Sequence, residues 1–265
     1  MNTKSVFLFL VLLATILSAC QATQPPATEA VVVVEQPTNI PLPTDTAVPT
    51  NTALPTETPK PTNTPLSEGV LFRDDFNGSL QPSWTWEAED PERWSFVDVN
   101  GKQWLQIVGD SGRTNVLKRE APSGNFAITA HIKADPYLNF HQANIFIFQD
   151  SENYIAINTG YCEPCPTGGY GYYMETAASG GDVLGHFYSV PRAAEDTDVY
   201  LKIELVDDVI SGYFATSPGE WTRVGRFGNS FELSSVGLGA TNSSPPSGTP
   251  EDIIAQFDYF EISSP

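Results

Sequence analysis

Two cysteines stand three positions apart, at Cys162 and Cys165, and thiols at this spacing can form a disulfide, bind a metal ion or exchange electrons. A zinc site needs two further ligands, and the neighbouring sequence supplies none. A thioredoxin-like redox pair needs a strand–helix–strand setting, which the sequence lacks. In an oxidising compartment, we therefore expect the two cysteines to form a local disulfide.

The same segment carries three tyrosines that could bind a sugar, Tyr161, Tyr170 and Tyr172. A tyrosine ring offers a flat apolar face to the C–H side of a sugar and a hydroxyl to its edge, and it loses little entropy on binding. The sequence leaves two roles open, because the rings could instead pack against the edge of the domain. We expect Trp86 and Tyr154 to contact a glycan as well, and most other tryptophans to lie in the core.

Catalytic carboxylates have one weak candidate pair. Glycoside hydrolysis needs two carboxyl groups that flank the scissile bond. Glu87 and Glu89 would share one face of a strand, but their acidic surroundings are more typical of a solvated hairpin. His131 lies on the polar side of a predicted strand, which favours an exposed histidine over a general base. These residues predict no hydrolase site.

The apolar run near the N-terminus ends in Leu17-Ser18-Ala19-Cys20, which resembles the lipobox of bacterial lipoproteins. The run is too short to cross a membrane core of about 30 Å, so it is typical of a cleaved signal. The resemblance implies removal of residues 1–19 and diacylation of Cys20, which would anchor the protein stably to a membrane. The alternative is an ordinary secretory signal with an unmodified cysteine. The residue after Cys20 is not the aspartate linked to inner-membrane retention, which favours outward display.

Residues 20–67 have a different composition, with 10 of the 22 prolines and almost no aromatic side chain. Such a segment cannot bury a core, and proline favours an extended backbone. We expect a lipidated cysteine followed by a disordered Thr/Pro-rich stalk.

Residues 68–265 are long enough for one domain and hold all five tryptophans. The chain has a formal net charge of −19 and no cluster of lysines and arginines in this region. Binding to a phosphate backbone requires such a cluster, so the sequence argues against nucleic acid as a partner.

Hydrophobic residues in this domain alternate with polar ones, which indicates strands. The clearest case is residues 199–206, followed by a turn at Asp207-Asp208 and a returning strand over 209–215. Many short strands separated by turn residues predict an all-β antiparallel sandwich, because each half-apolar sheet must cover its inner face. Similar alternation occurs in residues 126–133, 145–148, 154–158, 221–226, 236–240 and 256–262.

A more specific resemblance comes from short motifs that follow one another in order. Leu71-Phe72-Arg73-Asp74-Asp75-Phe76, Pro82-Ser83-Trp84-Thr85-Trp86 and the closing Phe257-Asp258-Tyr259-Phe260 are similar to the concanavalin A-like domain at the C-terminus of family 43 β-xylosidases. The resemblance covers most of residues 70–262. It implies a jelly-roll sandwich of two antiparallel sheets and an association with carbohydrate. It does not imply catalysis, because the hydrolytic carboxylates of those enzymes belong to a separate propeller domain.

Related jelly rolls sometimes hold a structural calcium ion, and Asp75 and Asp258 lie in terminal strands that would pair. Calcium takes six to eight oxygen ligands, so backbone carbonyls would have to complete such a site. We expect no cofactor, and a calcium ion at these two residues is kept only as an alternative. Cys162 and Cys165 depart from the family pattern and predict an insertion between strands.

Three functional hypotheses follow. The first is a surface-anchored lipoprotein that displays a non-catalytic carbohydrate-binding sandwich and captures a polysaccharide or oligosaccharide. The second is an envelope domain that has a structural role or binds a protein partner. The third is a glycosidase or lyase with an unrecognised pair of carboxylates. Exposed aromatic rings beside polar side chains would favour the first, and a flat apolar patch would favour the second.

Overall fold

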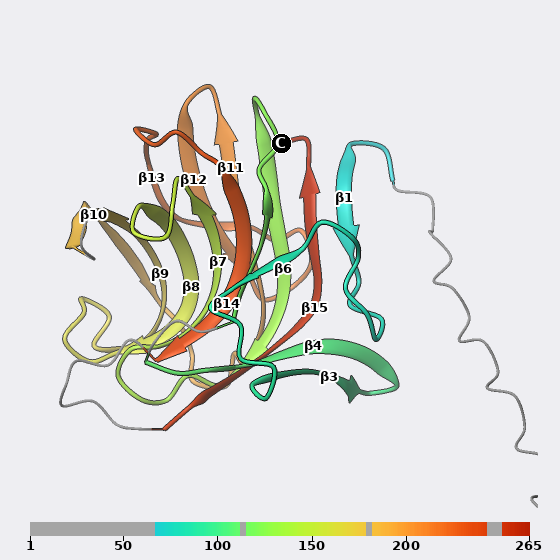
Figure 1. Ribbon diagram of the computed structural model, residues 1–265. Coiled ribbons are helices and arrows are strands. Elements are labelled where there is room, and N and C mark those ends of the chain that lie inside the picture. Colours follow the sequence, from blue (N-terminus) through green and yellow to red (C-terminus); the bar gives the residue numbers. More distant parts are fainter. Residues whose placement is uncertain (1–66, 112–114, 179–181, 243–250) are drawn as a thin grey trace, which may run out of the picture. The chain divides into compact units, whose positions relative to one another are not determined.

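In a computed structural model, the described residues are 67–111, 115–178, 182–242 and 251–265. The predicted signal peptide, Cys20 and nearly all of the predicted stalk lie outside them. The described residues form β-strands joined by turns, and the strands make two antiparallel sheets (Figure 1). This part of the chain contains no helix long and apolar enough to span a membrane. The predicted all-β sandwich is confirmed.

Sheet A is built around its longest strand. β15 pairs with β6 along one edge, and on the other edge it pairs with β4 through residues 253–257 and with β1 through residues 260–263. In spatial order the sheet contains β13 (Thr222–Gly228), β12 (Val209–Ala215), β11 (Asp198–Val206), β6 (Phe126–Ala134), β15 (Ile253–Ser263), β4 (Lys102–Gly109) and β3 (Trp94–Val99), with β1 (Val70–Asp74) beside β15.

Sheet B packs against sheet A and also mixes strands that are distant in sequence. In it, β14 pairs with β7 on one side and with β5 on the other. In spatial order the sheet contains β10 (Asp182–Pro191), β9 (Gly169–Ala178), β8 (Tyr154–Cys162), β7 (His141–Phe148), β14 (Ser235–Asn242), β5 (Val116–Glu120) and β2 (Thr85–Glu87).

The core lies between the sheets and follows from the alternation in the sequence. On β11, Val199, Leu201 and Ile203 are fully buried, while the residues between them face away from sheet B. Asp207 and Asp208 both have positive φ angles, 48° and 58°, as the tight turns of two-residue hairpins require. The predicted hairpin over residues 199–215 is therefore confirmed.

The two outward faces differ. On sheet B, the outward side chains of Asn144, Phe146, Phe148 and Asn158 are almost completely buried. On sheet A, the outward positions of β11 and its neighbours carry partly exposed aromatic and charged side chains, among them Tyr200, Lys202 and Glu204. Among the described residues, the outward face of sheet A therefore carries accessible rings and charges.

Candidate functional site

The predicted cysteine loop is present, at the end of β8. Cys162 and Cys165 form a disulfide, with their Cα atoms 5.3 Å apart. The loop returns into β9, and the Tyr161 and Tyr170 rings meet edge to face with centroids 4.9 Å apart. Both tyrosines are partly exposed, and Arg192 lies over the second ring at 5.1 Å. The structure thus brings two of the three predicted loop tyrosines together.

Tyr172 requires a correction. Its side chain is 1% exposed and stacks on Phe214 of sheet A, with ring centroids 3.7 Å apart. The residue pairs with Thr159, so its side chain points inward between the sheets. Tyr172 is a core residue, and it cannot contact a glycan at the surface.

Trp86 and Tyr154, the other two predicted glycan contacts, each lie against aromatic neighbours. Trp86 pairs with the buried Leu117 and stacks on Trp94 at 4.9 Å, so its ring packs against the core. Tyr154 lies on the outward face of sheet B against Phe146 and Phe148. Both rings are partly exposed, so a glycan contact by either one stays a prediction.

The acidic candidates already have partners. Glu87 accepts a hydrogen bond from Lys118, at 2.6 Å, and Glu89 accepts one from the Trp94 indole, at 3.2 Å. The two possible calcium ligands are also paired. Asp75 forms an ion pair with Arg73, and Asp258 forms one with Lys102. Within the described ranges, no group of three His, Cys, Asp or Glu side chains could hold a metal ion. Asp75 and Asp258 therefore do not fit the alternative of a shared calcium site.

His131 lies on the outward face of sheet A, as predicted. Its Nδ1 lies 3.0 Å from Asp258 and its Nε2 lies 2.5 Å from Asp198. The ring is also covered by aromatic neighbours, because it stacks on Tyr200 and lies 5.0 Å from the Trp104 ring. This cluster is partly buried and internally paired, which indicates a structural role.

An open arrangement of rings and charges lies on the outward face of β11, β12 and β13. Strand register places the side chains in two rows across these strands, and we call the set the outer groove. The first row is Lys202, Tyr213 and Arg223, and the second is Glu204, Ser211 and Arg226; Trp221, just before β13, completes the outer groove.

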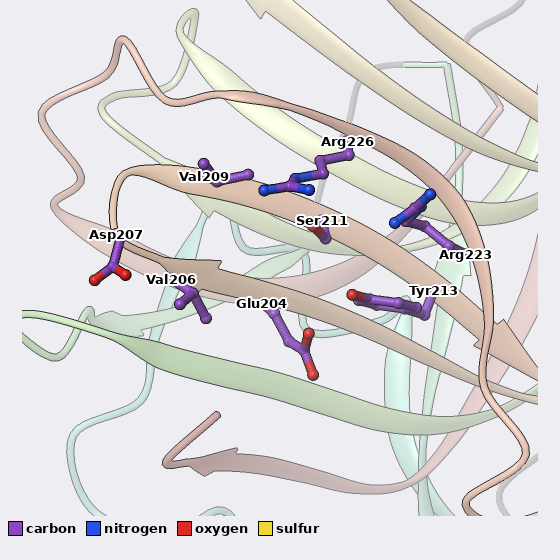
Figure 2. A pocket seen from close by; sticks show the side chains of 8 residues that line it. All are labelled: Glu204, Val206, Asp207, Val209, Ser211, Tyr213, Arg223 and Arg226. Atoms are coloured by element: carbon purple, nitrogen blue, oxygen red, sulfur yellow. The ribbon is translucent and has the colours of Figure 1, made fainter.

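A pocket of about 290 Å³ opens in the outer groove, near the lower end of the volumes usual for small-ligand sites. Figure 2 shows the arginines of β13 on one side of the pocket, Glu204 on the other and Tyr213 near its end. The lining residues are Glu204, Val206, Asp207, Val209, Ser211, Tyr213, Arg223 and Arg226.

Lys202 lies between the two aromatic rings of the outer groove and the carboxylate of Glu204. Its Nζ lies 4.7 Å from the Tyr213 ring centroid and 4.6 Å from the Trp221 centroid, within the range of cation–π contacts. The same Nζ donates to Glu204 at 2.6 Å. Both rings are partly exposed, so each keeps surface available to a ligand.

The electrostatics of the outer groove keep the Tyr213 hydroxyl protonated. Burial raises the pKa of Tyr213. The hydrogen bond with Ser211 lowers the pKa and the one with Glu204 raises it, so the pKa lies above its ordinary value. A protonated phenol can donate as well as accept a hydrogen bond, which suits recognition of a sugar hydroxyl.

Sequence reasoning missed the outer groove as a site. The strand over 221–226 was predicted, and the alternation on 199–206 correctly placed Tyr200, Lys202 and Glu204 on the outward side. The signal that could have pointed to the groove is the pair of arginines beside Trp221 in a strongly acidic chain. Their meeting with Tyr213 depends on strand register, which the sequence pattern does not specify.

Residues 73–263 match the model of one protein family, the β-xylosidase C-terminal concanavalin A-like domain. The chain belongs to this family. The match covers all but the ends of the described sandwich. No protein with a curated description matches the chain.

Solved structures with a similar fold include a variant of the GH43 protein BlXynB of Bacillus licheniformis, with TM-score 0.61, 18% identity, and coverage of 77% of this chain and 41% of that one. Xylan β-1,4-xylosidase of Bacillus halodurans C-125 has TM-score 0.59, 22% identity, and coverage of 79% and 41%. A GH16 protein of Bacteroides ovatus in complex with a product has TM-score 0.54, 13% identity, and coverage of 73% and 100%. At these identities the similarity concerns the fold, and the chain spans about two fifths of the GH43 proteins.

Proposed function

We propose that this concanavalin A-like domain binds carbohydrate without cleaving it, and that the outer groove is the binding surface. The observation that carries the proposal is the placement of two partly exposed rings, Tyr213 and Trp221, beside the polar side chains that line a pocket. Aromatic faces stack on the apolar faces of sugars, while hydroxyl, carboxylate and guanidinium groups bind sugar hydroxyls.

Binding without cleavage is favoured by the carboxylates of the outer groove. Glu204 accepts from Lys202, and Asp207 accepts from the Asn125 side chain at 3.2 Å. Both lie on the β11 side of the pocket rather than facing each other across it (Figure 2). A glycosidase needs two carboxyl groups on opposite sides of the bond that breaks, so these two do not make a hydrolytic pair.

We further propose that the domain is held outward at the cell envelope by lipid on Cys20. Labelling cells with a radioactive fatty acid tests this part. The full chain should take up label and fractionate with membranes, and Cys20→Ser should do neither. A chain that is labelled equally with and without Cys20 would contradict the anchor.

The binding proposal is tested with the full chain, solubilised in detergent and applied to an array of plant and microbial glycans. We expect binding to at least one glycan, with no release of reducing ends from it. Trp221→Ala and Tyr213→Ala should each weaken binding about tenfold or more, since stacking and hydrogen bonds are lost.

Tyr170→Ala is the matched control, because it removes a partly exposed tyrosine from the cysteine loop of sheet B. It should bind as the parent does. Absence of binding to every glycan would refute carbohydrate binding. Loss of binding in Tyr170→Ala, with Trp221→Ala unaffected, would instead place the site at the cysteine loop.

A further inference from the structure

We propose that the outer groove selects glycans that carry a carboxylate, such as polysaccharides of uronic acids, and that Arg223 and Arg226 recognise this group. The inference rests on the proposed function and goes beyond it by naming the class of ligand. Three observations carry it: the orientation of the two arginines, their lack of acidic partners, and the groups that surround them.

The orientation results from a β-bulge. In a regular strand, residues three positions apart point to opposite faces. Between β12 and β13, however, Gly212 pairs with Gly225 and Tyr213 pairs with Arg223, so Val224 is an extra residue on β13. The buried Val224 points inward, and the bulge turns Arg223 and Arg226 to the same outward face. Bulges often re-aim side chains at functional sites.

The two guanidinium groups are exposed, and within the described part of the chain neither makes an ion pair. Both therefore keep a positive charge open to solvent in a chain with 32 acidic and 13 basic residues. Other described arginines have partners: Arg73 binds Asp75 and Glu261, Arg93 binds Asp252, Arg119 lies over the Phe72 ring, and Arg192 donates to the Asp196 carbonyl. Holding two like charges side by side costs energy that a bound anion would recover.

The planar guanidinium group suits a carboxylate because it can donate two parallel hydrogen bonds to the two carboxylate oxygens. Beside the arginines, Ser211 and Glu204 can bind sugar hydroxyls, and Tyr213 offers a ring face. A uronic acid presents all three features at once, namely a carboxylate, hydroxyls and an apolar C–H face. A simple anion such as phosphate would use only the arginines, and a neutral sugar would leave them unpaired.

The test measures binding of the full chain in detergent to polygalacturonate and to the same polymer after its carboxyl groups have been reduced to alcohols. The parent should prefer the acidic polymer by about tenfold or more, as expected for a hydrogen bond between charged groups. Higher salt should narrow this preference, because the groove is exposed. Arg223→Gln, Arg226→Gln and the double variant should lose the preference while they still bind the reduced polymer.

Lys133→Gln is the matched control. Lys133 is an exposed cation on the same face of sheet A, outside the outer groove, and its removal changes the net charge by the same amount. This variant should keep the full preference. Equal loss in Lys133→Gln and Arg223→Gln would overturn the proposal in favour of general charge attraction. Stronger binding to dextran sulfate than to polygalacturonate would overturn the choice of a carboxylate.

The failure of this inference is distinguishable from the failure of the proposed function. If the parent binds the acidic and reduced polymers equally, the domain binds carbohydrate but the assignment of Arg223 and Arg226 is wrong. If the parent binds neither these polymers nor any glycan on the array, carbohydrate binding itself is refuted.

Discussion

The His131 ring lies parallel to the Tyr200 ring, with centroids 4.2 Å apart and planes 6° apart. This stack joins β6 to β11, because the two residues are cross-strand partners. The two ring nitrogens of His131 also face the carboxylates of Asp258 and Asp198. The cluster therefore ties three neighbouring strands of sheet A together.

We predict that His131→Ala lowers the free energy of unfolding by about 2 kcal/mol, because it removes the stack on Tyr200 and the contacts of the ring nitrogens with Asp258 and Asp198. Lys133→Ala, at the next outward position of β6, should change it by less than about 0.5 kcal/mol. Urea unfolding of both variants measures this difference. Equal midpoints would show that the cluster contributes nothing to stability.

Asp258 should make the stability of the domain depend on acid. Burial raises the pKa of this carboxyl, but hydrogen bonds from Lys102 and His131 outweigh burial, and the pKa falls below its ordinary value of 3.8. A lowered folded-state pKa means that the carboxylate adds stability above the unfolded-state pKa, and that this contribution is lost as pH falls through the folded-state pKa.

The variant Asp258→Asn should consequently be less stable than the parent at neutral pH, and the gap should close as the solution is acidified below about pH 3.8. Urea midpoints at several pH values, compared between the two proteins, provide the measurement. A gap that stays constant or widens in acid would contradict the assigned direction of the pKa shift.

The Tyr172 hydroxyl is buried, and it has no hydrogen-bond partner within the described residues. Tyr172→Phe keeps the stack on Phe214 and removes this unpaired group, so it should leave stability unchanged or raise it by up to about 1 kcal/mol. Tyr172→Ala should cost about 3 to 5 kcal/mol, because it leaves a cavity in the core. Thermal unfolding of the pair separates ring packing from the hydroxyl. A large loss in Tyr172→Phe would reveal a hydrogen bond that this geometry lacks.

Gly237 allows β14 to lie close to β5. A Cβ atom at this position would stand 2.2 Å from the backbone oxygen of Leu117, which cannot rotate away. We expect Gly237→Ala to cost about 3 kcal/mol or more. Gly228→Ala is the control, because a Cβ there meets no atom within 4 Å, and its midpoint should stay close to that of the parent. Similar urea midpoints for the two variants would mean that β14 can move away from β5 without a loss in the free energy of unfolding.

The strands were predictable wherever alternation was regular. The run at 199–206 coincides with β11 but for its first residue, and the run at 209–215 coincides with β12. β7 was predicted too short, as residues 145–148 of a strand that begins at His141. Its first half mixes polar and small residues, and two neighbouring strands rather than a local pattern hold it in the sheet.

The candidate site was less predictable, because it depends on relationships between strands. Tyr172 has the residue type of a binding ring, yet its register with Thr159 points it into the core. Arg223 and Arg226 would lie on opposite faces of a regular strand, and only the bulge at Val224 brings them together. A single sequence shows neither the register nor the bulge, so residue type alone placed Tyr172 among the binding rings and left out the two arginines.

The cysteine loop provides a final prediction that separates stability from binding. Cys162 and Cys165 are three positions apart, and the chain-entropy model gives about 2 kcal/mol for so short a closed loop. The double variant Cys162→Ser/Cys165→Ser should therefore have a lower urea midpoint, and its free energy of unfolding should fall by at most about 2 kcal/mol. Its affinity for glycans should not change, because the outer groove lies on sheet A and the loop lies on sheet B. Isothermal titration of the double variant checks this, and an affinity loss of about tenfold would return Tyr161 and Tyr170 to the centre of recognition.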